Sequence, residues 1–181
     1  MNQTVQRNQQ NHHQKRIQTL VFMGLFLSLE IILTRFLSIQ TPIVRIGFTF
    51  LPIALSAMMF GPWISGVTAA LADVLGMMLF SSGMPFFPGF TASAFLTGVI
   101  YGIFLYKKQK NLKNISLAVL LVSVVITLGL DTLWLWMLTG DGILVLLPAR
   151  ILKFIVMVPV QIMMIQTIWR YVLLRGRISA L

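Results

Sequence analysis

The chain has 181 residues, 57% hydrophobic and 10% charged, with a formal net charge of +10. A soluble globule of this size cannot bury so large an apolar fraction, so the composition excludes an ordinary soluble domain and predicts an integral membrane protein. The basic residues flank apolar segments and form no polar basic domain, which argues against nucleic-acid binding. The lack of cysteine excludes disulfides, thiolate catalysis and cysteine-ligated metals.

The first segment, residues 1–16, is rich in Gln, Asn and His, so we expect it to be a disordered cytoplasmic tail before a membrane domain of residues 17–181. His12 and His13 lie in this tail without a third ligand nearby, which favours a solvated tail over a metal site. No metal or cofactor is predicted. The tail lacks the apolar core and cleavage site of a signal peptide, so the first apolar run is expected to stay as a helix.

Six apolar segments follow, and a membrane-spanning helix needs about 20 such residues. They run approximately over Ile17–Ser38, Phe48–Phe60, Pro62–Phe80, Phe90–Lys107, Ile115–Leu138 and Pro148–Leu173. The second segment, at about 13 residues, is short for a span, which favours a tilted or partly inserted helix beside a loop. The sequence therefore predicts an all-α membrane protein, a compact bundle of six transmembrane helices.

The positions of the charged residues predict the orientation of this bundle. Ten of the 14 Lys and Arg residues lie in the tail, in the loop after the fourth segment and at the C-terminus: Arg7, Lys15, Arg16, Lys107, Lys108, Lys110, Lys113, Arg170, Arg175 and Arg177. Cytoplasmic loops are enriched in Lys and Arg, and six spans put these three places on one side. We therefore expect both termini in the cytoplasm and the chain in a bacterial plasma membrane, as a multi-pass protein.

The remaining charges group towards the outer side of the predicted bundle. They are four cations, Arg35, Arg45, Arg150 and Lys153, and the four acids of the chain, Glu30, Asp73, Asp131 and Asp141. Helices that begin on this side add positive potential from their N-terminal ends, which favours an anionic ligand group. The pattern indicates a binding site near the outer mouth.

Outer loop 81–89 places Phe86, Phe87 and a methionine between Pro and Gly residues. Its prolines limit conformational freedom, and the two phenylalanine rings can stack on a flat ligand. Aromatic residues also anchor proteins at the headgroup level of a membrane, so both interpretations stay open.

Two of the predicted spans carry small residues at helical spacing. The sets are Gly66, Ala69, Ala70 and Gly76 in the third span and Ala94, Gly98 and Gly102 in the fourth. Such faces permit close helix packing inside the monomer. Asp73 lies on the first of them, and because an ionisable group within a span is costly, it either holds a nearby hydroxyl or helix terminus or contacts a substrate.

Asp131 and Trp134 share one helix face by their spacing, as do Arg150 and Lys153 at the outer start of the sixth span. A carboxylate, an indole and two cations at one depth suit a polar pocket. The alternative is an internal ion pair that ties the two helices together.

No set of residues suits catalysis, because both His lie in the tail and no nucleophile elbow or metalloprotease motif is present. The chain also lacks the Gly-rich run of an ATP site. We therefore expect a protein that is not an enzyme and that takes energy for any transport from another protein.

Four stretches carry a family resemblance: residues 34–38, the Arg-Ile-Gly-Phe to Pro segment 45–53, Phe60-Gly61-Pro62, and the Ala-Asp-x-Leu-Gly segment within 69–76. They resemble the membrane S components of energy-coupling factor (ECF) vitamin transporters, most of all the folate-specific type. The resemblance implies a six-helix vitamin-binding subunit that joins a transmembrane coupling protein and two cytoplasmic ATPases. It also implies docking through the first helix, where Gly24 and Ser28 stand at the small positions.

Folate has a flat pterin, an aminobenzoyl ring and a glutamate tail with two carboxylates, and each part finds residues of matching chemistry. Cations for carboxylates or carbonyls are Arg35, Arg45, Arg150 and Lys153; aromatic side chains for stacking are Phe48, Phe86, Phe87 and Trp134; acceptors for the pterin amino edge are Asp131 or Glu30. Arg45 is the cation we most expect at the ligand, because it has no acid within four residues, whereas Arg35 follows Glu30 on one helix.

The sequence thus predicts an S component that captures folate from outside and passes it inward with an ATP-driven partner complex. Two alternatives stay open. The first is an S component for another vitamin or nucleobase-like compound. The second is a non-transporting membrane scaffold, in which the outer polar residues form internal ion pairs.

Overall fold

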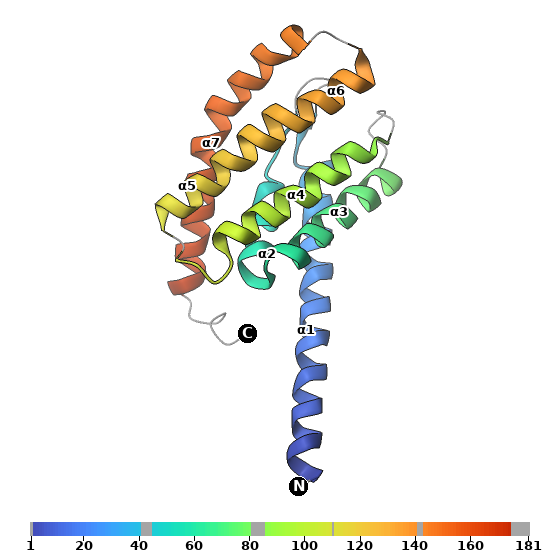
Figure 1. Cartoon of the computed structure of the whole chain (residues 1–181), viewed down its shortest axis with the longest axis vertical. Coiled ribbons are helices and arrows are strands. Elements are labelled where there is room, and N and C mark those ends of the chain that lie inside the picture. The colour runs from blue at the N-terminus through green and yellow to red at the C-terminus, as the bar shows by residue number, and fades with distance from the viewer. Residues whose placement is uncertain (1, 41–44, 81–85, 110, 141–142, 175–181) are drawn as a thin grey trace.

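A computed structural model describes residues 2–40, 45–80, 86–109, 111–140 and 143–174 (Figure 1). Its helices are α1 (Asn2–Arg35), α2 (Phe50–Phe60), α3 (Pro62–Leu79), α4 (Pro88–Leu105), α5 (Leu112–Leu121), the π-helix η1 (Val122–Leu130), α6 (Asp131–Thr139) and α7 (Ile143–Leu174). Because α5, η1 and α6 follow one another without a break, they form one rod. The described residues therefore form the six-helix bundle that the sequence predicts.

Two short strands stand between α1 and α2. They are β1 (Ile39–Gln40) and β2 (Arg45–Ile46), and they pair antiparallel with Ile39 opposite Ile46. The hydroxyls of Thr34, at the end of α1, and Thr49, just before α2, lie 3.0 Å apart. This contact holds the two ends of the α1–α2 connection together.

Five helical segments are long and apolar enough to cross a membrane by length and composition: Arg16–Arg35, Pro62–Leu79, Pro88–Leu105, Leu112–Thr139 and Leu147–Tyr171. Helix α2 is apolar but has 11 residues, so the short second segment is confirmed as a helix below spanning length. The arrangement fits a multi-pass membrane protein.

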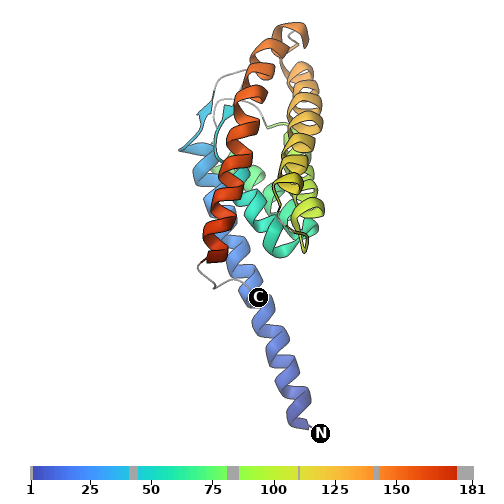
Figure 2. The same cartoon turned by 90° about the vertical axis from the view of Figure 1, so that its left-hand side faces the viewer.

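Helix α1 differs from the expectation of a disordered tail, because it begins at Asn2 and extends beyond the rest of the bundle (Figures 1 and 2). Gln, Lys and Arg are good helix formers, and the tail contains neither Gly nor Pro. A helix already formed in the apolar part needs no new nucleus to continue outward. The division between tail and membrane domain at residue 16 stays a prediction.

Glycine contacts bring α3 and α4 together, and the two helices run side by side in Figure 1. A Cβ added to Gly98 would lie 2.7 Å from the backbone nitrogen of Gly66, and one added to Gly102 would lie 2.2 Å from Cα of Pro62. No side chain fits at these distances. The expected packing of small residues inside the monomer is therefore confirmed at Gly66, Gly98 and Gly102.

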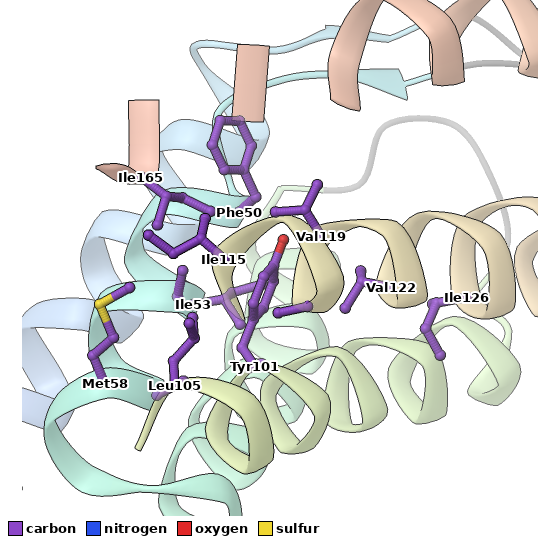
Figure 3. Close-up of a cluster of buried hydrophobic side chains, with 14 of the residues drawn as sticks. Phe50, Ile53, Met58, Tyr101, Leu105, Ile115, Val119, Val122, Ile126 and Ile165 are labelled. Atoms are coloured by element: carbon purple, nitrogen blue, oxygen red, sulfur yellow. The ribbon is translucent and has the colours of Figure 1, made fainter. Parts of the chain in front are cut away.

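The apolar core lies between α2, α4, α7 and the α5–η1–α6 rod (Figure 3). Its fully buried side chains include Tyr101, Leu105, Ile115, Val119 and Ile165. Lipid tails are as apolar as these side chains, so close packing rather than exclusion from water holds the helices together. The core holds these helices in place relative to one another, and the same helices carry the polar residues of the candidate site.

Candidate functional site

The polar residues singled out in the sequence lie on helix ends that meet at one end of the molecule. In Figure 1 the C-terminal end of α3 and the N-terminal end of α4 lie at the right, the C-terminal end of α6 and the N-terminal end of α7 lie above them, and α1 extends away in the opposite direction. Three groups of contacts occur on these helices. We call them the tryptophan cluster (Phe87, Phe90, Ser93, Trp134), the arginine junction (Thr127, Asp131, Thr132, Arg150) and the charge cluster (Glu30, Arg35, Asp73, Thr91).

The tryptophan cluster joins α6 to the start of α4. Trp134 Nε1 donates a hydrogen bond to Ser93 Oγ at 3.2 Å, and the Trp134 ring centroid lies 5.8 Å from that of Phe87. The centroid of the Phe90 ring lies 6.0 Å from that of Phe87, in an edge-to-face arrangement. A Cβ on Gly89 would lie 2.6 Å from the Trp134 ring and 2.5 Å from the Phe87 ring, so the indole packs directly against the α4 backbone. Two predicted stacking residues, Phe87 and Trp134, are thus brought together.

The arginine junction joins α7 to η1 and α6. Arg150 is buried, at 7% exposed, and its Nη1 donates to the Thr127 carbonyl and to Thr132 Oγ1, both at 2.9 Å. Asp131 lies within electrostatic reach of the same guanidinium. These hydrogen bonds link α7 to η1 and α6 through neutral oxygen atoms, whereas the alternative that the sequence offered was an ion pair. Thr127 and Thr132 were not singled out in the sequence.

The π-helix is a feature that sequence reasoning missed, since the fifth span was expected to be a regular helix. At its end the Asp131 N–H donates to the carbonyl of Ile126, five residues back, where an α-helix would use the fourth. The weak signal for it is composition, because η1 is rich in β-branched residues and contains Gly129, all poor α-helix formers. π-Helical turns are rare and occur often at functional sites.

The charge cluster joins α1 to α3 and α4. Asp73 Oδ2 accepts a hydrogen bond from Thr91 Oγ1 at 2.8 Å, so the hydroxyl contact that the sequence offered as a structural role for Asp73 is present. Arg35 lies over Gly76, whose added Cβ would be 3.3 Å from Arg35 Nε. Asp73 is within electrostatic reach of both Arg35 and Glu30.

Glu30 is the most buried acid of this cluster, at 3% exposed. Among the residues that the structure describes, neither of its carboxyl oxygens has a hydrogen-bond partner. The sequence paired Arg35 with Glu30 because both lie on one helix. In the structure the acid within electrostatic reach of Arg35 is Asp73 of α3, and this contact across helices could not be inferred from spacing.

The remaining site residues predicted from the sequence are Phe48, Phe86, Lys153 and Arg45. Phe48 is exposed with its ring 6.4 Å from Phe50, and Phe86 is exposed before α4. Lys153 is half-buried on α7, one turn after Arg150. Arg45 is in β2, but its side chain lies outside the described part of the structure, as do residues 81–85 and Asp141.

Comparison with known proteins gives the family. The model for the ECF transporter substrate-specific component matches residues 18–176 of this chain. The chain belongs to this family. It is 47% identical over 158 residues to the folate transporter FolT of Clostridium novyi (strain NT), a match that covers 87% of this chain and 91% of the relative. The folate transporter FolT of Leuconostoc mesenteroides subsp. mesenteroides is 30% identical over 148 residues, which cover 78% of this chain and 79% of that protein.

A solved structure of the same family has the same fold. The crystal structure of FolT bound with folic acid matches with a TM-score of 0.80 and 37% sequence identity, over 82% of this chain and 90% of that one. This S component is therefore a multi-pass protein of a transporter family, as its apolar helices indicate.

The two small residues expected at a docking face are exposed on α1 of this S component. A Cβ on Gly24 would meet no atom within 4 Å, and the Ser28 hydroxyl turns back to donate to the Gly24 carbonyl at 2.8 Å. Bulky apolar side chains, among them Leu25 and Leu29, are exposed beside them. The exposed side of α1 thus has a shallow point that another helix can approach closely.

Proposed function

We propose that this S component binds folate at the outer end of its bundle and delivers it inward together with an ATP-driven partner complex. The observation that carries the proposal is the match to FolT bound with folic acid, at 37% identity over 82% of the chain. At this identity and coverage the ligand class is expected to be shared. The relatives named as folate transporters support the same substrate.

The tryptophan cluster suits the ring systems of folate. We place the pterin or the aminobenzoyl ring against Trp134 and Phe87, because aromatic rings at 5.8 Å already form a stacking surface. Phe48, just before α2, and Phe86, just before α4, are exposed, and we propose that they cover the ligand from outside. Asp131 is one turn before Trp134 on the same face, so it is the proposed acceptor for the pterin amino edge, with Glu30 as the alternative acceptor.

The glutamate tail of folate needs cations. Arg45 and Arg35 lie on the two sides of the β1–β2 connection, and Lys153 follows Arg150 on α7. We propose that these cations meet the two carboxylates, with Arg favoured where a carboxylate takes a forked contact. Arg150 already donates to protein groups, the Thr127 carbonyl and the Thr132 hydroxyl.

The partners proposed for this chain are a transmembrane coupling protein and two cytoplasmic ATPase subunits, because S components are the substrate-specific parts of ECF transporters. Gly24 and Ser28 on α1 are the proposed docking point. The chain binds and carries folate without catalysing a reaction, and it does so in the bacterial plasma membrane. Both termini are proposed to be cytoplasmic, since ten of the 14 Lys and Arg residues lie in the N-terminal tail, in the segment between α4 and α5 and at the C-terminus.

The test is binding by the purified protein in detergent, without ATP or partner proteins. Folate is expected to release heat in calorimetry and to quench tryptophan fluorescence at micromolar concentrations, because ring stacking and charge pairing enclose most of the ligand. Thiamine, riboflavin and biotin serve as controls. If one of these vitamins binds and folate does not, the protein is an S component for that vitamin. If none of the four compounds releases heat or quenches fluorescence, a non-transporting scaffold is favoured.

A further inference from the structure

We propose that Arg150 is a positioning residue: it locks the junction between η1 and α6 and so sets the place of Trp134, rather than binding the carboxylates of the ligand. The inference rests on the proposed folate-binding function. On charge alone, Arg150 would be expected to bind the glutamate tail of folate, and the inference gives it a positioning role instead.

The first step concerns the backbone at the junction. The last π-type hydrogen bond runs from Asp131 N–H to the Ile126 carbonyl, and α6 then follows with α-helical spacing. A change from five-residue to four-residue spacing skips one carbonyl, and Thr127 is next in line after Ile126. A carbonyl without a donor is costly inside a membrane. Arg150 Nη1 donates to the Thr127 carbonyl at 2.9 Å, and the Thr132 hydroxyl adds a longer hydrogen bond to the same carbonyl at 3.5 Å.

The second step concerns the donors of Arg150. A guanidinium Nη carries two hydrogens, and the second contact of Nη1 is Thr132 Oγ1, also at 2.9 Å. Thr127 belongs to η1 and Thr132 to α6, so one nitrogen spans the junction and has both hydrogens engaged. With 7% of the side chain exposed, Arg150 is enclosed by protein. A charge-assisted bond in this setting is stronger than a neutral one.

The third step connects the junction to Trp134, two residues after Thr132. If η1 relaxed to regular α-helix by one residue, α6 would rotate by about 100° and shift by about 1.5 Å relative to α4. Trp134 would then lose its hydrogen bond to Ser93 and its contact with Phe87. Arg150 opposes this relaxation because it holds both sides of the junction from α7.

A direct contact between Arg150 and the ligand would give a different pattern of losses, and pteroate separates the two cases because it is folate without the glutamate. Positioning predicts that Arg150→Ala weakens folate and pteroate binding by the same factor, roughly tenfold or more. Ligand contact predicts a loss for folate alone. Calorimetry with both compounds on the full-length protein measures the two factors.

A spectroscopic measurement reads the position of Trp134 directly, in protein with Trp63, Trp136 and Trp169 replaced by Phe. Thr132→Val removes the hydroxyl that accepts from Arg150 and that donates to the Thr127 carbonyl, without touching the charge. We expect it to shift the Trp134 emission maximum in the ligand-free protein. Thr139→Val is the matched control, because this exposed α6 hydroxyl donates to the Leu135 carbonyl of its own helix. It should leave the emission unchanged.

The inference is overturned if Arg150→Ala weakens folate but not pteroate, or if Thr132→Val leaves the Trp134 emission as in its parent. Should Arg150→Ala fail to fold, Thr132→Val replaces it in the binding comparison with the same expectation of equal losses. Failure of the unsubstituted protein to bind either compound would instead refute the proposed function, while the emission test of ligand-free protein would still decide the role of the junction.

Discussion

Gly89→Ala is expected to weaken folate binding through the tryptophan cluster. The new Cβ would lie 2.6 Å from the Trp134 ring and 2.5 Å from the Phe87 ring, so at least one ring must move. Moving the indole breaks an aromatic pair, which contributes about 0.5–1.5 kcal/mol, and the hydrogen bond to Ser93, which contributes a further 0.5–1.5 kcal/mol or so. The total of about 1–3 kcal/mol corresponds to a loss of roughly fivefold to 150-fold in affinity.

Calorimetric titration with folate measures this loss, and a melting curve in detergent shows whether the variant is folded. Gly24→Ala is the matched control, because a Cβ there meets no atom within 4 Å and Gly24 is exposed on α1. It should bind folate as the unsubstituted protein does. Unchanged affinity in folded Gly89→Ala protein would refute the assignment of Trp134 and Phe87 to the ligand.

Three further substitutions test other parts of the molecule. Gly24→Leu or Ser28→Leu should leave folate binding intact and abolish uptake by the reconstituted complex, and surviving uptake would place the docking surface elsewhere. Arg45→Ala should weaken binding about tenfold to a hundredfold, as for one charge-assisted bond, whereas Arg45→Lys recovers most of it only if the contact is not forked. Gly98→Ala should lower the melting temperature, because its Cβ would lie 2.7 Å from the backbone of α3; an unchanged melting curve would argue against this packing.

The helical layout could be predicted because local chemistry sets it. Gly61, with a φ of 88°, and Pro62, at the first position of α3, mark the α2–α3 connection in the sequence as in the structure. Pro88 starts α4 in the same way. The start of α1 was missed because polar composition does not separate a solvated helix from a coil. The π-helix was missed because weak α-helix propensity favours it no more than other irregularities.

The sequence predicted which residue types form the candidate site, but it did not predict which residues contact one another. Aromatic residues beside Pro and Gly marked Phe87, and spacing marked Trp134, yet nothing in the sequence connects either to Ser93. Thr91 and Thr127 are likewise ordinary residues of apolar spans. Their hydrogen bonds depend on which helices pack together, and helix packing is decided by the whole bundle.

Helices α3, α4, α6 and α7 are held to one another around Trp134 by contacts of different kinds. Glycine packing and the Asp73–Thr91 hydrogen bond join α3 to α4, Trp134–Ser93 joins α4 to α6, and Arg150 joins α6 to α7. The proposed docking helix α1 adds Arg35 and Glu30 to this set through Asp73, and Thr91 stands one turn after Phe87. We therefore expect a partner that displaces α1 to act first on the charge cluster and, through Asp73 and Thr91, on the stacking surface.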